Sequence, residues 1–147
     1  ASPEGTRRTP EIGPHVRRCI DFYMCFPEGL EIRVVDYGRR PRQPDVERRR
    51  AIAIDALESV AARLAELDPG LATERLQLRR EPSADDDDEQ WLGSTVGREL
   101  QFLASHTIHH YALIALALRL AGRPVPEDFG VAPSTLEHWR REGHTAR

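Results

Sequence analysis

The sequence predicts an all-α protein, a four-helix bundle, with room for a short β-hairpin between the second and third helices. Three segments carry apolar residues at three- and four-residue spacing, which is typical of helices that bury one face. The last of them contains "YALIALALRLAG", which is apolar nearly all round and is therefore expected to lie buried at the centre of the bundle. At 147 residues the chain suits one domain, so residues 1–147 are interpreted as a single helical domain.

The charge and hydropathy of the chain argue against two classes of partner. A net charge of -3 and a pI near 6.1 give no electrostatic reason to expect nucleic acid or an anionic membrane surface. The arginines of "RRPRQPDVERRR" lie beside acids and form no stripe interleaved with aromatic residues. The longest apolar run, 111–121, is well short of the roughly 20 residues that a membrane span needs. We therefore expect no nucleic acid and no membrane as partners.

Two features point to the cytoplasm as the location. Cys19 and Cys25 are six residues apart in one predicted helix and face different sides of it, so no disulfide is expected between them. The first residues lack both an initiator Met and the apolar core of a signal peptide, which is typical of a trimmed start without targeting information.

The first helix is expected to begin near Pro14, a residue suited to a first turn, and to end at Pro27 or Gly29. Its apolar stripe consists of Val16, Cys19, Ile20, Tyr23 and Phe26. The next segment, "DYGRRPRQPD", is rich in Pro and Arg and is predicted to be a loop.

A second amphipathic helix is predicted over residues 46–67, ended by "DPG". Beyond it the apolar period changes: "ERLQLRRE" alternates, and "EQWLGST" is expected to return as its partner strand across the acidic "SADDDDE" turn. A calcium loop is the other interpretation of Asp85–Glu89, but the run lacks the internal glycine and the distal glutamate of such loops, which favours a solvated turn.

The third helix is expected to open after Ser94 or Thr95, either of which can cap it, and to continue to Ala121 with Gly122 as its stop. The tail is largely irregular, with a last short helix reaching Arg141. Its "DFG" tripeptide does not indicate a kinase, because the chain has neither a glycine-rich phosphate loop nor a catalytic-loop motif.

Three histidines lie within five residues of the third helix, in "SHTIHH". His106 and His110 are four apart, so their rings project from one face and can converge on a divalent metal such as Zn²⁺. His109 lies about 100° around the helix from His110 and cannot serve the same ion. The other interpretation is that these are polar core residues bonded to neighbouring helices, although each buried imidazole then needs its own partner.

Together with "GREL" before it and "GRPVPEDFGVAPST" after it, "SHTIHHYALI" closely resembles the DinB/YfiT-like superfamily of metal-binding four-helix bundles. "IGPHVRRCIDFY" resembles the first metal-binding helix of that family. The resemblance covers most of the chain and is strongest over residues 96–135. It implies one divalent metal held by a histidine of an early helix and by two histidines four apart on a later helix.

The resemblance assigns His106 and His110 to the later pair. The expected early histidine falls on Arg18, and Phe22 stands where a further histidine is common, so this chain departs from the pattern at both positions. His15 lies one turn earlier on the same face. Either His15 reaches the metal through a shifted first helix, or the site has lost a ligand; we favour His15 as the third ligand.

Characterised relatives in the superfamily include thiol-dependent S-transferases and isomerases, so the resemblance implies a metal that activates water or a low-molecular-weight thiol. The reaction is then of the hydrolase or thiol S-transferase type, on a small-molecule substrate. Zn is the first expectation for the ion, with Ni, Fe or Cu accepted by the same ligands. Glu99, two turns before His106, is the candidate base, with an exposed position as its alternative. Asp21 is expected to orient a ligand or Arg18, or to form a surface salt bridge.

The competing hypothesis is a non-catalytic dimeric helical-bundle binding protein with a degenerate metal site. It follows from the arginine and phenylalanine that replace imidazoles at Arg18 and Phe22. A homodimer is expected under both hypotheses, because the run at 111–121 offers more apolar surface than a small bundle covers.

Overall fold

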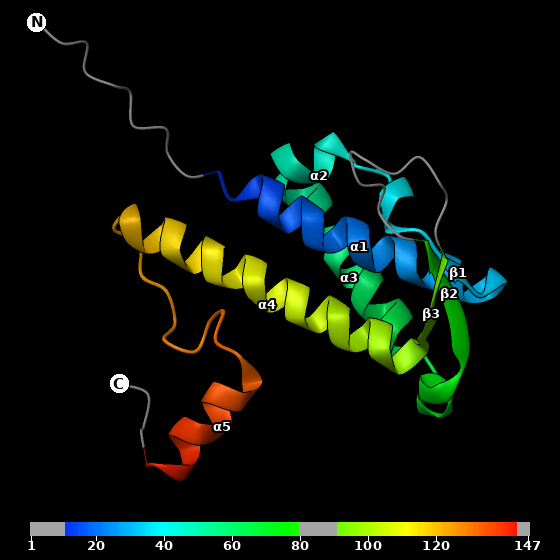
Figure 1. Cartoon of the computed structure of the whole chain (residues 1–147). Helices are drawn as coiled ribbons and strands as arrows, with labels where there is room; N and C mark the ends of the chain where they lie inside the picture. The colour runs from blue at the N-terminus through cyan, green and yellow to red at the C-terminus, as the bar shows by residue number, and fades with distance from the viewer. Residues whose placement is uncertain (1–10, 80–90, 144–147) are drawn as a thin grey trace, which may run out of the picture.

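The computed structural model describes residues 11–79 and 91–143 (Figure 1). The described chain is mostly helical, as predicted, with a small three-stranded sheet at one end of the long helices. The helices are α1 (Gly13–Ile32), α2 (Pro44–Arg48), α3 (Arg50–Ala65), α4 (Val96–Leu120) and α5 (Pro133–Arg141); the strands are β1 (Val34–Val35), β2 (Arg75–Arg79) and β3 (Trp91–Thr95); and two 3₁₀ segments are η1 (Tyr37–Arg39) and η2 (Pro69–Thr73).

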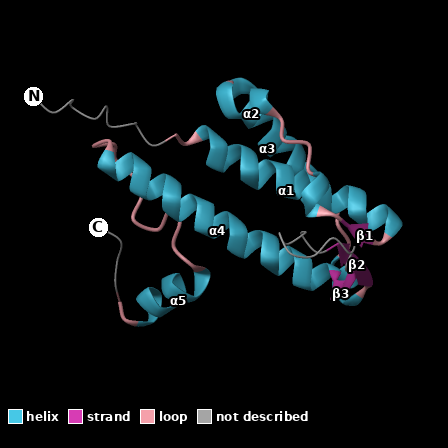
Figure 2. Cartoon of the chain, turned by 45° about the horizontal axis from the view of Figure 1, so that its top comes forward, coloured by secondary structure: helices cyan, strands magenta, loops and turns pink. Residues whose placement is uncertain are grey.

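The two longest helices, α1 and α4, run side by side, and α3 also packs against α1 (Figures 1 and 2). The main core lies where the C-terminal half of α1, the sheet and the N-terminal half of α4 meet. It consists of Phe22, Cys25, Phe26, Val35, Tyr37, Leu76, Val96 and Leu103. The histidines that the sequence singles out lie farther from the sheet, at the start of α1 and in the middle of α4.

Helix α1 is longer than the sequence predicts. The prediction that it ends at Pro27 or Gly29 is wrong, because the helix continues to Ile32. A proline inside a helix costs on the order of 3 kcal/mol. Phe22 and Phe26 are buried on this helix at 6% and 0% exposure, and each buried phenylalanine contributes about 1.5–3 kcal/mol. Burial of the two rings therefore offsets the cost of Pro27.

Gly29 serves a close contact with β1 and does not end α1. A Cβ atom on Gly29 would lie 2.7 Å from the Val34 carbonyl oxygen and 2.7 Å from Cγ2 of Val35. The helix ends instead at Ile32, and the next residue, Arg33, has a left-handed conformation with φ of 59°.

The second predicted helix is two helices, α2 and α3, and the prediction of one continuous helix over 46–67 is wrong in this respect. Arg49, between them, has an extended conformation with φ of -119° and ψ of 104°. Contacts with α1 hold α2 in place: Val46 is 2% exposed, and Glu47 forms an ion pair with Arg17 at 2.7 Å. Such contacts between distant residues leave no local signal in the sequence.

The predicted hairpin is confirmed, since β2 and β3 pair antiparallel with Arg75 opposite Thr95 and Arg79 opposite Trp91. The segment that joins them, including the candidate calcium run at 85–89, lies outside the described residues. Strand β1, which the sequence did not predict, pairs in parallel with β2. The sheet thus ties the end of α1 to the start of α4.

Helix α4 has nearly the bounds that the sequence predicts. The Thr95 hydroxyl caps it by accepting a hydrogen bond from the Arg98 N–H at 3.2 Å. Gly122, with φ of 69°, follows its end. None of the described helices is long and apolar enough to cross a membrane.

The chain after α4 turns back along the helix before it reaches α5 (Figure 1). The rings of Tyr111 and Phe129 stack with centroids 4.9 Å apart. Gly130 has φ of 78°, and a Cβ atom there would lie 2.5 Å from the Ala112 nitrogen. Beyond this contact, α5 forms the expected last short helix and buries none of its residues.

Candidate functional site

The structure brings His15 next to the histidines of α4. His15 lies in the first turn of α1, and its Nδ1 atom is 2.9 Å from Nδ1 of His110 although the two residues are 95 positions apart. The rings of His106 and His110 lie edge to face with centroids 4.6 Å apart. His109 is exposed on the flank of the same turn. The three histidines selected from the sequence are therefore neighbours in space.

The separation of the two Nδ1 atoms is compatible with two arrangements. One ring can donate a hydrogen bond to the other if their tautomers differ. Two nitrogen ligands, each roughly 2.0–2.1 Å from one metal ion, also lie about 2.9–3.4 Å apart in octahedral or tetrahedral geometry. The observed 2.9 Å falls within this interval.

The surroundings of His110 favour the uncharged form of its imidazole. It is 4% exposed, and burial, together with the nearby His106 and His15, lowers its pKa to about 4. Its buried Nε2 atom has no hydrogen-bond partner among the described residues. A neutral imidazole is the form that binds metal ions.

His106 faces a different neighbour. Its ring stacks on Phe22 with centroids 4.3 Å apart, and it also lies near Phe102. Within residues 11–79 and 91–143, no three His, Cys, Asp or Glu side chains are placed so that they could hold one ion. A site that used all three histidines would require the His106 ring to turn from this position.

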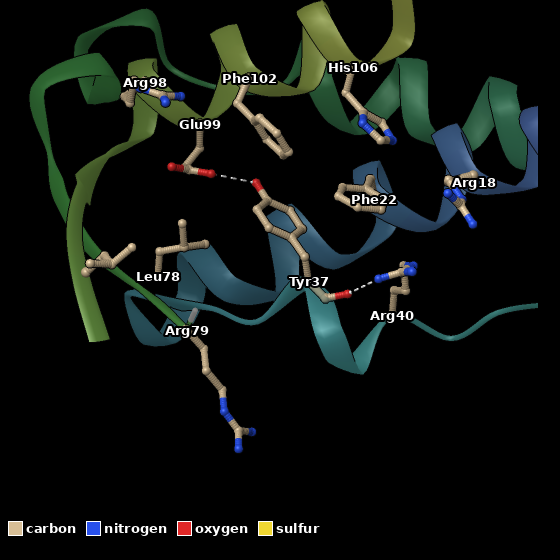
Figure 3. Close-up of a pocket in the computed structure, with 11 residues that line it drawn as sticks. Arg18, Phe22, Tyr37, Arg40, Leu78, Arg79, Arg98, Glu99, Phe102 and His106 are labelled. Atoms are coloured by element: carbon tan, nitrogen blue, oxygen red, sulfur yellow. Dashed lines mark hydrogen bonds between the residues drawn. The ribbon is translucent and has the colours of Figure 1, made fainter. Parts of the chain in front are cut away.

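A pocket of about 480 Å³ extends from His106 along α4 (Figure 3). Helices α1 and α4, the segment around η1, and strands β2 and β3 supply its walls. The lining residues are Arg18, Phe22, Tyr37, Arg40, Leu78, Arg79, Leu92, Arg98, Glu99, Phe102 and His106. The histidine cluster thus adjoins a cavity large enough for a small molecule.

Glu99 lines the end of the pocket opposite His106 (Figure 3). It is 2% exposed, so the alternative of an exposed glutamate is wrong. Its carboxylate accepts hydrogen bonds from the Tyr37 hydroxyl at 2.9 Å and from the Ser94 hydroxyl at 2.5 Å. Burial and the adjacent carboxylate raise the pKa of Tyr37, so this phenol stays protonated and continues to donate.

Two further polar residues have roles that the sequence left open. Arg18 is exposed and contributes to the wall of the pocket. Asp21 is fully buried and pairs with Arg17 at 3.0 Å, and Arg17 also binds Glu47. Asp21 is thus not a surface salt bridge, and it orients Arg17 and not Arg18. The ion pair between Arg17 and Glu47 links α1 to α2.

Neither cysteine is suited to act as a nucleophile. Cys19 and Cys25 are free, as the sequence predicts, and both are buried. Burial raises the pKa of each thiol to about 11. A thiolate is the reactive form, so a thiol that takes part in chemistry here must come from a ligand.

Sequence reasoning missed most residues of the pocket, and three of them show why. Tyr37 and Arg40 belong to a segment that the sequence marks only as a loop, and Phe102 was not singled out on α4. Phe102 lies three residues after Glu99 and four before His106, so helical spacing from these two candidates would have found it. Nothing local indicates that Tyr37 bonds to Glu99, which is 62 residues away.

Comparison with known proteins identifies a relative over most of the chain. A stretch of 116 residues, 79% of the chain, is 31% identical to FK506-binding protein 5 of Rhizopus delemar. The matched stretch makes up 30% of that protein, so the chain spans less than a third of its length. No family model matches the chain. No solved structure matches it either.

Proposed function

We propose that the chain is a metal-dependent enzyme of the DinB/YfiT-like superfamily, in which His15, His106 and His110 bind one divalent transition metal. The observation that carries the proposal is the 2.9 Å separation of Nδ1 atoms from two different helices, one of them on a buried histidine with a pKa lowered to about 4. The mostly helical fold is compatible with a bundle of this superfamily. Zn is the first expectation for the ion, and Ni, Fe or Cu are alternatives.

The donor set fits such an ion in part. His15 and His110 present nitrogen atoms at a suitable spacing, and the buried Nε2 of His110 lacks a partner among the described residues. His106 is one helical turn away on the same face and completes the set if its ring turns from Phe22 toward His110. Three imidazoles leave coordination positions open for water or substrate, as in catalytic sites.

His15, His106 and His110 would hold the metal, and the chemistry it would supply is a lowered pKa for a bound water molecule or low-molecular-weight thiol, as a hydrolase or S-transferase reaction on a small electrophile would need. The chain itself contributes the pocket, in which the aromatic rings of Phe22 and Phe102 lie beside His106. Glu99 is the candidate proton acceptor within that pocket. Tyr37 and Ser94 fix the position of its carboxylate.

A non-catalytic dimeric helical bundle with a degenerate metal site is the second candidate. It is favoured by the stacking of His106 on Phe22 and by the lack, among the described residues, of a preformed group of three ligands. Under this alternative, the contact between His15 and His110 is a hydrogen bond between two imidazoles, and the pocket binds a ligand without transforming it.

The Rhizopus delemar relative is named as an FK506-binding protein, and the match covers 30% of its length. FK506 binding is therefore a property to be tested for this chain, by titration of FK506 into the purified protein. Location in the cytoplasm and assembly into a homodimer are further parts of the proposal.

Cobalt substitution tests the enzyme and the alternative against each other. Purified chain without an affinity tag is stripped with a chelator, loaded with Co²⁺, and its visible absorption recorded before and after addition of glutathione. We expect a protein-bound cobalt spectrum that gains a thiolate-to-cobalt charge-transfer band, because a coordination position is open to the thiol. Absence of any protein-bound cobalt would contradict the proposal and favour the degenerate site.

A further inference from the structure

A second cavity, of about 450 Å³, opens between α1, the end of α3, η2 and the start of α4. Tyr23 and Leu100 line it, whereas the residues just before them, Phe22 and Glu99, line the pocket beside His106. Successive residues of a helix point about 100° apart, so α1 and α4 separate the two cavities. The cavities have no lining residue in common. We call the second one the apolar cleft, and its lining consists of Tyr23, Leu64, Leu67, Asp68, Pro69, Ala72, Val96 and Leu100.

The lining of the apolar cleft offers few polar partners to a ligand. Asp68 supplies the one carboxylate among the described residues of the lining; it is exposed and accepts a hydrogen bond from the Gly70 N–H at 2.9 Å. No arginine or histidine is among these described residues. The Tyr23 hydroxyl lies 3.4 Å from the Thr107 hydroxyl on α4. A charged ligand would therefore lose its water in the cleft without gaining partners in exchange.

Packed elements hold the walls of the apolar cleft in place. Tyr23, Leu67 and Leu100 are half-buried and pack against the main core. On the side of η2, a Cβ atom on Gly97 would lie 2.9 Å from the Ala72 carbonyl oxygen and 3.4 Å from the Ala72 Cβ atom. This close contact needs a glycine and sets η2 against the first turn of α4 (Figure 1). The cleft is thus largely preformed, as sites for small molecules usually are.

The size and the chemistry of the apolar cleft fit a small apolar molecule. Sites for small molecules have volumes of about 300–1,000 Å³ and mostly hydrophobic walls. Leu64, Leu67 and Leu100 are only half-buried, so part of their apolar surface still meets water. Removal of such surface from water by an apolar ligand is favourable. Apolar cavities in proteins accept uncharged molecules such as benzene for this reason.

We propose that the apolar cleft binds a small uncharged molecule with an apolar body, such as a fused aromatic ring system, in contact with Tyr23, Leu64 and Leu100. The ligand is held by burial of apolar surface on both sides and not by ion pairs. Asp68 at the rim disfavours an anion. The inference goes beyond the proposed function, because the cleft uses none of the histidines and none of the residues of the pocket beside His106.

Fluorescence titration of the full chain with N-phenyl-1-naphthylamine tests the inference, because this uncharged probe brightens in apolar surroundings. We expect saturable binding at one site per chain. Leu64→Gln should weaken the binding at least about 5-fold, because the new amide must lose water to the ligand without gaining a hydrogen bond. Leu57→Gln is the matched control and should leave the affinity unchanged. Leu57 lies two turns earlier on α3, is 41% exposed and does not line the cleft.

Ala72→Leu tests the same cleft without introducing a polar group. Ala72 is exposed and lines the cleft, so the larger side chain should keep the helical circular dichroism of the wild type and lower the affinity for the probe at least about 5-fold by occupying its space.

The absence of saturable binding, equal affinities of Leu64→Gln and Leu57→Gln, or an unchanged affinity of Ala72→Leu would each overturn the inference. The affinity of the wild type should also be independent of protein concentration. An affinity that falls as the protein concentration is raised would show that a second copy of the chain covers the cleft, and would overturn the inference as well.

Discussion

His110 is the residue on which the chemistry of the cluster depends most. Its burial keeps the imidazole neutral well below the pH at which an exposed histidine would take up a proton, and its pKa is about 4. Between pH 4 and the ordinary pKa of about 6.5, the unfolded chain therefore binds a proton at this residue that the folded chain does not.

The pH dependence of stability follows from this difference. Because the unfolded state binds more protons, the free energy of unfolding should fall as the pH drops from about 6.5 to 4. His110→Gln should reduce this loss, and His109→Gln, in the same turn but exposed, should retain it. Denaturant titrations of the metal-free wild type and of each variant at several pH values measure these pH dependences. Identical pH profiles for the wild type and His110→Gln would show that another group controls the acid sensitivity.

The sequence predicts part of the candidate site, for a clear physical reason. Residues four apart on a helix share a face, so the pairing of His106 and His110 can be derived from spacing alone. The contact of His15 with His110 depends on how α1 lies against α4, and only a family resemblance suggested it. The bond from Tyr37 to Glu99 spans a loop and a sheet, and no local pattern encodes such a contact.

Among the elements, α4 is the one whose bounds follow most directly from the sequence. Thr95 caps its start and Gly122 follows its end, and both signals are local. The end of α1 was missed because burial of Phe26 outweighs the effect of Pro27. Strand β1 was missed because a pair of valines in a parallel ladder has no period to detect.

The segment that returns along α4 depends on a glycine. A Cβ atom on Gly130 would lie 2.5 Å from the Ala112 nitrogen, whereas one on Gly122 would meet nothing within 4 Å; both residues have positive φ. We expect Gly122→Ala to cost about 1 kcal/mol from backbone strain alone. Gly130→Ala should cost about 1–3 kcal/mol more, because the backbone of the segment must move away from α4. Denaturant unfolding of the two variants measures the difference.

Equal losses of stability in Gly130→Ala and Gly122→Ala would show that the segment is not packed against α4 as described. Quenching of tyrosine and tryptophan fluorescence gives an independent check. Displacement of the segment by Gly130→Ala should make Tyr111 more accessible to a soluble quencher, because Phe129 covers its ring.

For the whole molecule, the exposed apolar side of α4 is the feature that bears on assembly. Leu116 and Leu120 are 54% and 72% exposed, and as residues four apart they lie on one face of the helix. Contiguous apolar surface of this kind is typical of protein interfaces. A homodimer through this face follows from the proposal.

Sedimentation equilibrium at micromolar concentration tests the dimer. The wild type is expected to sediment as a dimer, and the double variant Leu116→Glu/Leu120→Glu as a monomer, because four carboxylates would then face one another without partners. Ile32→Glu is the matched control, since Ile32 is 70% exposed at the end of α1 beside the sheet. A monomeric wild type, or a monomeric Ile32→Glu variant, would contradict an interface on α4.

The central claim is that α1 and α4 hold one metal ion between them, and metal analysis of tag-free protein equilibrated with Zn²⁺ tests it most directly. We predict one ion per chain in the wild type and in His109→Ala, whose altered side chain is exposed. His15→Ala and His110→Ala should each lose the ion, because their Nδ1 atoms lie 2.9 Å apart. Retention of the ion by both of these variants, or its absence from the wild type, would contradict the claim.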